Sequence, residues 1–500
     1  MFSLRQALRG LCHHNLFSRY PIYGRRYLLT LAIESSCDDT SVAIVEKHGG
    51  LTSESPSPTV TSVHFLENIT ADSRKYNGIH PIVALDSHQE TTAKLINKAL
   101  TYLPAADVTG VKDVGQLISL PSSAASGASP LLRRKPDFIS VTRGPGMRSN
   151  LSVGLDTAKG LSVAWQVPIV GVHHMQAHLL TPRLAASLQQ PRGGEIDTES
   201  MNSPNFPFMS ILVSGGHSLL VHSKSIVDHE ILASTSDIAI GDALDKIARS
   251  LLPKSFLAQS NTTMYGKLLE AFAFPNGSSD YADYQPPATR TEEVMKSMDN
   301  KWGWSFPLPF AQTRKMEFSF AGVASRAQTI ISNKKDRWEA ADNTGNGFMS
   351  NDERVDLARA FMTVCFEHLA SRTMIALQNL HEQQQEQREQ YQDPPPYESQ
   401  KLENVGHLVI SGGVGANQFL RKLFRSFLDI RGFQHVKVIA PPPYLCTDNA
   451  AMIGWAGIEM FEAGWRSDLG CRPLRKWTLD ARAEDGGILG PDDWIKTKPI

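Results

Sequence analysis

Residues 27–46, YLLTLAIESSCDDTSVAIVE, place an apolar run before a small polar turn and a second apolar run after it. Residues 208–222, FMSILVSGGHSLLVH, repeat this plan around a Ser-Gly-Gly-His turn. Apolar runs rich in β-branched residues and separated by small residues are typical of β-hairpins. Two hairpins of the same design predict two similar lobes, each opened by its own hairpin.

A third run supports a mixed α/β fold. Residues 407–420, HLVISGGVGANQFL, read as a strand, a glycine turn and the start of a helix. Helical patterns also cover residues 87–100, 151–165 and 354–380. Strands mixed with helices in two hairpin-led halves predict an α/β protein whose lobes enclose a cleft.

Composition narrows the class of protein. The chain has 500 residues, of which 41% are apolar and 20% charged, as expected of a globular protein with more than one domain. No apolar run approaches the ~20 residues of a membrane span, so no membrane insertion is expected. The five cysteines form no CxxC pair. A disulfide framework is therefore not expected, and a reducing compartment fits.

The first 29 residues differ from the rest. They contain five arginines and no carboxylate, since the first acidic residue is Glu34. Leu4, Leu8 and Leu11 can share one helix face. This composition predicts a mitochondrial transit peptide over residues 1–29, and a disordered basic tail is the alternative. Removing five positive charges takes the net charge from −1 to −6, so any nucleic-acid contact requires a local basic patch.

Polar and low-complexity segments divide the chain. We expect an N-terminal lobe over 30–205, a C-terminal lobe over 206–460 and an extension over 461–500. Low-complexity, polar or glycine-dotted composition marks the expected insertions, which are 104–135, 272–311, 333–352 and 381–400. The glutamine-rich segment 381–400 is expected to form a solvated loop.

Glycine turns follow two of the predicted strands, in Val213-Ser-Gly-Gly216 and Ile410-Ser-Gly-Gly413. Glycines let backbone amides approach a phosphate closely, and a helix N-terminus adds partial positive charge. With the Glu34–Thr40 turn, this pattern favours nucleotide binding, although single tight turns look alike. Neither a P-loop nor a Rossmann fingerprint is present.

The segment Thr142–Ser149, TRGPGMRS, follows another predicted strand. Pro145 between two glycines indicates a tight bend before a helix. Arg143 and Arg148 beside the helix start could hold an anionic group. A purely structural strand-to-helix turn with exposed arginines explains the pattern equally well.

Three histidines lie in Gly171–Leu180, GVHHMQAHLL. His174 and His178 are spaced i, i+4, so on a helix they face one way and could bind one metal ion, whereas His173 is out of register. The pair alone, without a third ligand, is more typical of exposed or capping histidines. Asp448, in the turn LCTDNAAMIG, is the candidate third ligand. Two histidines, an aspartate and open positions suit a divalent ion that binds a substrate oxygen.

A metalloprotease motif is absent from this stretch. The HExxH signature has a glutamate, the general base, directly after the first histidine. Met175 and Gln176 follow His174 instead. Neither a thioether nor an amide accepts a proton at neutral pH, so peptide hydrolysis is disfavoured.

Together these runs resemble the tRNA N6-adenosine threonylcarbamoyltransferase family, formerly described as glycoproteases or O-sialoglycoprotein endopeptidases. The motifs follow the family order over most of residues 28–457, and the basic start resembles the mitochondrial member. The matching runs are Ile33–Val42, Arg143–Gly146, Gly154, Ala158–Gly160, Gly171–Met175, Ala177-His178, Leu212–His217, Asp245-Lys246, Phe318–Phe320, Ser411–Val414, Ala416-Asn417 and Cys446–Ala451.

The resemblance implies an architecture, a reaction and a site. The architecture is that of actin, Hsp70 and the sugar kinases, with two ribonuclease-H-like lobes and a nucleotide cleft between them. The reaction is the transfer of threonylcarbamoyl from threonylcarbamoyl-AMP to N6 of the adenosine 3′ of the anticodon (position 37), in tRNAs reading codons that begin with A. The implied metal ligands are His174, His178 and Asp448, and the implied adenylate contacts are Leu212, Val213, Ser214, Gly215, Gly216, Asp245, Gly266 and Asn417.

The resemblance also implies partners and a location. It implies one divalent ion per subunit (iron or zinc), a homodimer, the mitochondrial matrix, and a separate synthase that supplies threonylcarbamoyl-AMP. It assigns no catalytic residue beyond the metal site. Basic candidates for contact with tRNA are scattered, namely Arg143, Arg148, Arg314, Lys315, Arg421 and Lys422.

Some residues depart from the family pattern. Gln176 replaces the usual glutamate, and Asp237–Asp242 reads DIAIGD in place of Asp-Asp-Ala-x-Gly-Glu. An insertion replaces the usual Pro-Gly-Gly-Pro, so the assignment of Gly266 depends on the Leu269-Glu270 that follows it. Two other classes remain open, a metallopeptidase and a non-catalytic nucleotide-binding scaffold of the same fold.

Overall fold

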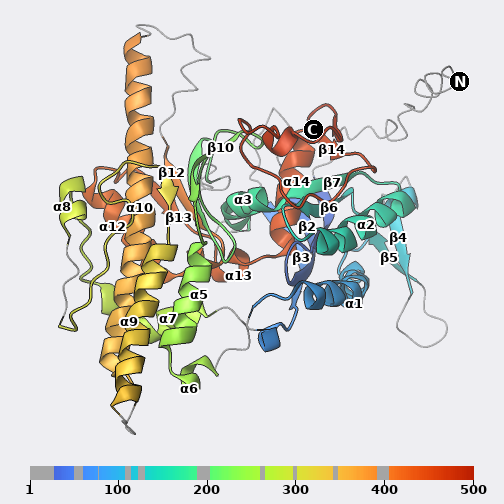
Figure 1. Cartoon of the computed structure of the whole chain (residues 1–500). Coiled ribbons are helices and arrows are strands. Elements are labelled where there is room, and N and C mark those ends of the chain that lie inside the picture. The colour runs from blue at the N-terminus through green and yellow to red at the C-terminus, as the bar shows by residue number, and fades with distance from the viewer. Residues whose placement is uncertain are drawn as a thin grey trace, which may run out of the picture.

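The computed structural model describes residues 27–49, 60–76, 78–106, 114–121, 130–188, 203–258, 265–296, 301–341, 347–390 and 405–500. These residues form two lobes, each built on one β-sheet (Figure 1). The helices α3 (His174–Ser187) and α14 (Ala450–Glu462) pack against each other between the two sheets. The expected transit peptide lies outside the described residues, apart from residues 27–29, which begin the first strand.

The first sheet has the strand order β15-β14-β7-β6-β1-β2-β3. Strands β1 and β2 form the predicted hairpin, with Ile33 opposite Val42, and β3 continues it antiparallel. Strands β6 and β7 then run parallel to β1. The bounds are β1 (Tyr27–Glu34), β2 (Asp39–His48), β3 (Val60–Thr70), β6 (Phe138–Gly144), β7 (Ile169–His173), β14 (Trp465–Ser467) and β15 (Trp494–Lys496).

The second sheet repeats this topology in the order β11-β10-β9-β8-β12-β13. Strands β8, β9 and β10 form an antiparallel meander, and β11 pairs parallel with β10. On the other side, β12 and β13 lie parallel to β8. The bounds are β8 (Phe208–Val213), β9 (Ser218–Ser223), β10 (His229–Thr235), β11 (Glu317–Phe318), β12 (His407–Ser411) and β13 (Lys437–Ile439). The shared order, a three-stranded meander followed by two parallel strands, confirms the predicted pair of ribonuclease-H-like lobes in the actin/Hsp70/sugar-kinase architecture.

Strand β8 shows why both faces of the second sheet are covered. Its side chains alternate between two cores, because successive residues of a strand point to opposite faces. Met209 and Ile211 enter the core formed with the outer helices, whereas Phe208 and Leu212 enter the core shared with α3 and α14. The outer helices are α5 (Ile240–Leu251), α7 (Gly266–Ala273), α9 (Ala321–Ala340), α10 (Asn351–Gln390) and α12 (Gln418–Ile430).

The first sheet is covered by helices from distant parts of the chain. One face carries α1 (Pro81–Leu100) and α2 (Arg148–Trp165), and the other carries α14. A Cβ atom at Gly454 would lie 2.7 Å from the Val45 side chain, and one at Gly457 would lie 2.0 Å from the Ser140 hydroxyl. Small residues along α14 therefore let this helix lie directly on the strands.

The end of the chain completes the first sheet. Helix α14 packs on β1, β2 and β6, and β14 and β15 extend the sheet beyond β7. From the sequence, residues up to 460 were expected in the second lobe and 461–500 in a separate extension. The structure places 450–460 and the two final strands with the first lobe, because the small-residue face of α14 fits that sheet.

The insertions contain short elements. Strands β4 (Leu117–Leu120) and β5 (Leu131–Arg134) pair within 104–135, and α8 (Arg290–Met295) lies within 272–311. The expected loop at 381–400 is partly wrong, since α10 continues to Gln390, and residues 391–400 lie outside the described residues. Glutamine and glutamate are good helix formers, which explains the continuation. None of the described helices, α10 included, is both long and apolar enough to cross a membrane.

Candidate active site

Three potential metal ligands meet where the two lobes join. His174 and His178 lie one turn apart on α3, and Asp448 lies in the loop between α13 (Pro443–Cys446) and α14. The Asp448 Oδ1 atom is 3.0 Å from His178 Nε2 and 3.5 Å from His174 Nε2. One ligand atom from each residue falls within 4.8 Å of the others. The fold thus brings together the three residues that the sequence suggested.

His173 starts the helix that carries the two histidines. Its Nδ1 atom accepts the Met175 and Gln176 amides at 3.2 and 3.4 Å, which caps α3, and its Nε2 atom donates to the Trp477 carbonyl at 3.0 Å. Burial lowers the pKa of His173 to about 3, so the ring is neutral and can accept these bonds. His173 is therefore a structural residue.

Asp448 is held by contacts on both sides of its loop. The Asn68 side chain donates to the Asp448 carbonyl at 2.9 Å, and the Ala450 amide donates to the Ser41 hydroxyl at 2.9 Å. Asn449 caps α14 by accepting the Met452 amide at 3.0 Å. Strands β2 and β3 thereby position a carboxylate from the far end of the chain.

Glu34, the last residue of β1, contacts His174 on the ring nitrogen that faces away from Asp448. Its fully buried carboxylate accepts from His174 Nδ1 at 3.0 Å, from the Thr142 hydroxyl at 2.5 Å and from the Ser36 amide at 2.6 Å. Burial acts to raise the pKa of Glu34, but the adjacent His174 holds that pKa below its ordinary value. Burial likewise acts to lower the pKa of His174, but Glu34 and Asp448 hold it well above its ordinary value.

This donor set fits a divalent cation. With a metal bound, both imidazoles would be neutral, and the Glu34 and Asp448 carboxylates would leave a charge of −2 that a divalent ion neutralises. Ligand atoms that share one ion at about 2.0–2.2 Å are separated by roughly 3 Å, as the Asp448 contacts are. A carboxylate behind a metal-binding histidine, as at Glu34, fixes the ring orientation. His174, His178 and Asp448 would leave further coordination positions for substrate.

We expect Glu34→Gln to weaken metal affinity by about 10- to 100-fold, because an amide carries no charge to hold the His174 Nδ1 proton. Isothermal titration of the metal-free protein with Zn²⁺ or Fe²⁺ measures this change. Glu459→Gln is the control, since Glu459 is also buried but pairs with Arg183. Equal affinity of the Glu34 variant and wild type would show that this contact plays no part in metal binding.

The Ser-Gly-Gly turn lies at the end of β8. Leu212 and Val213 are fully buried, so only their backbone can face a ligand, whereas Gly215 and Gly216 are exposed. The Gly241 amide at the start of α5 donates to the Ser214 carbonyl at 3.2 Å. A helix N-terminus and an exposed glycine turn are thus adjacent, which is the arrangement that favours a phosphate.

Asp245 lies in α5, Gly266 begins α7, and Asn417 directly precedes α12. The Asp245 carboxylate accepts the Gly266 amide at 2.7 Å, which caps α7, and burial raises the pKa of Asp245 to about 6. The Asn417 side chain caps α12 by accepting the Leu420 amide at 2.9 Å. Glu270 of α7 accepts the Gln418 amide at 2.7 Å, which joins α7 to α12. Each of these residues therefore positions a helix start, whatever else it contacts.

Sequence reasoning missed His217, the residue that ends the Ser-Gly-Gly turn, as a site residue. Its carbonyl accepts the Ser214 amide at 2.8 Å and closes the turn. Burial, together with the nearby charges of His174 and His178, lowers the pKa of His217 to about 4. A neutral imidazole at the end of the glycine turn is thus within range of the charges of the metal ligands. Its place at the end of the Ser-Gly-Gly-His motif was the available signal.

Comparison with known proteins agrees with this geometry. The family model for TsaD, tRNA N6-adenosine threonylcarbamoyltransferase, matches residues 127–455. The protein named mitochondrial tRNA N6-adenosine threonylcarbamoyltransferase from Schizosaccharomyces pombe is 33% identical over 481 residues, covering 95% of this chain and 90% of that protein.

The chain belongs to the tRNA N6-adenosine threonylcarbamoyltransferase family.

A bacterial relative supports the same assignment. The tRNA N6-adenosine threonylcarbamoyltransferase of Bartonella henselae is 29% identical, covering 91% of this chain and 96% of that protein. The enzyme of Zymomonas mobilis with the same name is 28% identical, with 91% and 93% coverage. As a member of this family the chain is a transferase, and the S. pombe relative is a mitochondrial one.

Gln176, the departure from the threonylcarbamoyltransferase pattern, does not face the metal ligands. Its Nε2 atom donates to the Ile226 carbonyl at 2.6 Å and lies 3.4 Å from the Met460 sulfur. The side chain is fully buried between α3, the loop after β9 and α14. The carboxylate behind the metal site is Glu34, so the exchange at position 176 does not remove it.

Arg143 has a structural role in this transferase. The sequence left open whether Arg143 and Arg148 hold an anion. Arg143 is buried and donates to both Asp493 oxygens, at 2.6 and 2.5 Å, and to the Arg472 carbonyl at 3.0 Å. It therefore attaches the C-terminal segment to the first lobe, whereas Arg148 is exposed.

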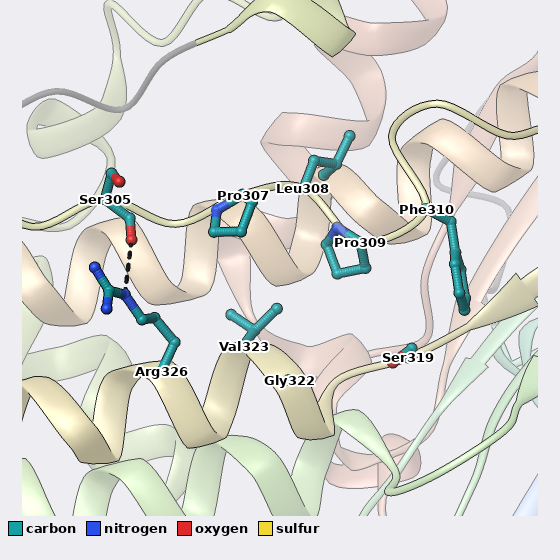
Figure 2. Close-up of a pocket in the computed structure, with 9 residues that line it drawn as sticks. All are labelled: Ser305, Pro307, Leu308, Pro309, Phe310, Ser319, Gly322, Val323 and Arg326. Carbon is teal, nitrogen blue, oxygen red and sulfur yellow. Dashed lines mark hydrogen bonds between the residues drawn. The ribbon is translucent and has the colours of Figure 1, made fainter.

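A hollow of about 540 Å³ lies elsewhere on the second lobe (Figure 2). The segment with Pro307 and Pro309 runs over the first turns of α9, and Arg326 donates to the Ser305 carbonyl at 3.4 Å. The Ser319 hydroxyl donates to Asp237 at 2.6 Å. None of the predicted site residues of the threonylcarbamoyltransferase family lines this hollow.

Proposed function

We propose that the protein transfers threonylcarbamoyl from threonylcarbamoyl-AMP to N6 of adenosine 37, next to the anticodon, in mitochondrial tRNAs reading codons that begin with A. One observation carries this proposal. In a chain of this family, the three candidate metal ligands come together, and the charges of His174 and His178 act on the ring of His217, which ends the exposed Ser-Gly-Gly turn. A metal site beside a phosphate-binding turn suits the transfer of an acyl group from an adenylate.

The reaction balances without another reactant. The N6 nitrogen forms a bond to the carbamoyl carbon, the bond from that carbon to the phosphate oxygen breaks, N6 loses one proton, and AMP leaves. A bound divalent ion supplies Lewis-acid polarisation of the carbonyl and of the departing phosphate. The chain's own contribution is to hold both substrates in reacting geometry.

Individual residues take separate parts in this scheme. His174, His178 and Asp448 would hold the ion, and Glu34 keeps the proton on His174 Nδ1, so that Nε2 faces the ligand. Amides of Ser214, Gly215 and Gly216 would donate to the adenylate phosphate as preorganised hydrogen-bond donors. Leu212 and Val213 place this turn from the core, and Asp245, Gly266 and Asn417 would position the nucleotide through α7 and α12.

The proposal extends to partners and location. The protein takes threonylcarbamoyl-AMP from a separate synthase, binds one iron or zinc ion per subunit, and acts as a homodimer. Its basic segment ahead of β1, residues 1–26, serves as a transit peptide to the mitochondrial matrix. The mitochondrial S. pombe relative supports this location.

A reconstituted assay tests the activity. Purified protein is mixed with a threonylcarbamoyl-AMP synthase, threonine, bicarbonate, ATP and an unmodified tRNA that reads ANN codons, and the nucleosides are analysed by mass spectrometry. We expect threonylcarbamoyladenosine with this tRNA and none when its position 37 is guanosine. Complete absence of product would overturn the transferase proposal. Cleavage of a protein substrate would favour the metallopeptidase alternative, and adenylate binding without either reaction would favour a scaffold.

A further inference from the structure

Four exposed cations surround the turn between β6 and α2. Arg148 opens α2, and Arg472, Arg475 and Lys476 follow β14 in the C-terminal segment. All four are exposed. Among the described residues, none of the four side chains makes an ion pair or a hydrogen bond. We call this set the cationic rim.

Backbone contacts join the rim to the metal site. The Leu474 amide donates to the Arg143 carbonyl at 2.9 Å, and the Gly146 amide approaches the Arg475 carbonyl at 3.4 Å. On the other side of the turn, the Met147 amide donates to the Ser36 carbonyl at 2.9 Å. The Ser36 hydroxyl lies 3.2 Å from His174 Nδ1. One short turn therefore separates the rim from a candidate metal ligand.

Two glycines allow this close approach, because a side chain at either position would clash with the neighbouring backbone. A Cβ atom at Gly144, where φ is +156°, would lie 2.2 Å from the Leu474 carbonyl oxygen. A Cβ atom at Gly146 would lie 2.7 Å from the Ser36 carbonyl oxygen. The C-terminal segment, the turn and the Glu34–Thr40 loop are thus packed backbone against backbone, so the rim has a defined position relative to the site.

The rim is not needed to hold its own segment in place. Other contacts do this, since Arg143 pairs with Asp493, and Trp477 donates to the Gly487 carbonyl at 2.9 Å and accepts from His173 at 3.0 Å. Lys159 is also attached, because its ammonium group donates to the Cys471 carbonyl. The four rim cations therefore project from a segment held by other residues and have no ion-pair partner within the described residues.

The local charge differs from that of the whole chain. The whole chain carries 50 basic and 51 acidic residues. Near the rim, the Asp493 carboxylate already forms an ion pair with Arg143. Two other acids of this segment accept backbone amides, Asp468 from Gly470 at 2.7 Å and Asp485 from Thr478 at 3.2 Å. Four unpaired cations in an otherwise balanced protein form the local basic patch that binding to a polyanion requires.

Other cations suggested by the sequence lack this freedom. Arg314 donates to Asn379, Lys315 pairs with Glu317, and Arg421 donates to the Gly415 and Pro441 carbonyls. Together with Arg143, four of the six sequence candidates are thus engaged within the fold. Only Arg148 and Lys422 remain, and Arg148 belongs to the rim.

We propose that Arg148, Arg472, Arg475 and Lys476 bind the phosphate backbone of the tRNA beside the adenosine that enters the site. The inference rests on the proposed function, which requires the anticodon loop to reach the metal site. Phosphates flank every nucleotide of that loop, and cations next to the site meet them when the adenosine enters. Lysine and arginine contacts of this kind set the position of a nucleic acid and make affinity depend on salt.

Direct binding tests the inference independently of catalysis. The double variant Arg475→Gln with Lys476→Gln is compared with wild type by fluorescence anisotropy of a labelled, unmodified tRNA transcript at several salt concentrations. We expect its Kd to rise roughly 5-fold or more, and the slope of log Kd against log salt to fall by about 1 to 2. Thermal unfolding should match wild type, because these exposed side chains make no hydrogen bond or ion pair within the described residues.

A control variant removes the same charge elsewhere. Lys94 on α1 and Lys254 on α6 (Lys254–Leu257) are exposed, and their side chains make no hydrogen bond or ion pair within the described residues. Lys94→Gln with Lys254→Gln should leave Kd and the salt slope unchanged. Equal tRNA affinity of the rim variant and this control would overturn the inference, and the rim would then face an acidic protein or solvent. Loss of the proposed activity alone would not, because Kd is measured without the reaction.

Discussion

Replacing His178 with alanine is expected to reduce bound metal to background and to lower kcat/KM for tRNA modification by more than about 100-fold. His178 Nε2 lies 3.0 Å from Asp448 Oδ1, and the side chain is almost completely buried. The variant leaves only His174 and Asp448 as ligands. Since loss of a supporting group behind a ligand already costs about 10- to 100-fold, loss of a ligand costs more. Elemental analysis of the purified protein and nucleoside mass spectrometry measure the two effects.

His222→Gln is the matched control for this experiment. His222 is also a buried histidine, but it lies in β9, and neither ring nitrogen has a hydrogen-bond partner among the described residues. We expect this variant to keep its metal and its activity. Circular dichroism and thermal unfolding separate loss of metal from loss of fold. A His178 variant that keeps wild-type metal content and activity would rule out the proposed ligand set.

Gly412→Ala is expected to lower the free energy of unfolding by about 3 kcal/mol or more. Gly412 has φ +86° and ψ 167°, a region that side chains avoid. Its added Cβ atom would lie 2.3 Å from the Val213 carbonyl oxygen, which is backbone and cannot move aside. The clash falls where β8 and β12 end together, so it also displaces the Ser-Gly-Gly turn. Urea-induced unfolding followed by tryptophan fluorescence measures the change.

The neighbouring glycine provides the control. Gly413 has no positive φ, and a Cβ atom there would meet nothing within 4 Å. We expect Gly413→Ala to change stability by less than about 1 kcal/mol. A comparable loss in both variants would mean that the strain at Gly412 is not the cause. If Gly412→Ala yields no soluble protein while Gly413→Ala is produced normally, the expected order of stability is still upheld.

Sequence patterns predicted the local elements well because each depends on residues close together in the chain. The hairpin around residues 34–40 and the one around 214–217 both form as expected. The glutamine-rich segment after residue 380 was interpreted as a loop because low complexity is typical of solvated chain. Helix propensity prevailed there, and α10 continues to Gln390.

The candidate site was predicted in part. The spacing of His174 and His178 follows from helix geometry, and their placement on one face needed no tertiary information. The roles of Arg143 and His217 could not be read in the same way. An arginine before a glycine turn resembles an anion site. Only the fold shows that Arg143 is paired with Asp493, 350 residues away.

The sequence by itself determined the strands, the glycine turns, the histidine pair and, through its motifs, the family. Each is a local pattern of side-chain size and polarity. Only the tertiary structure decided that Asp448 meets His178 across 270 residues, that Glu34 lies behind His174, and that the C-terminal segment places its cations beside this site. These contacts depend on the strand order of the two sheets and on the packing of α14 against the first, which local patterns do not specify.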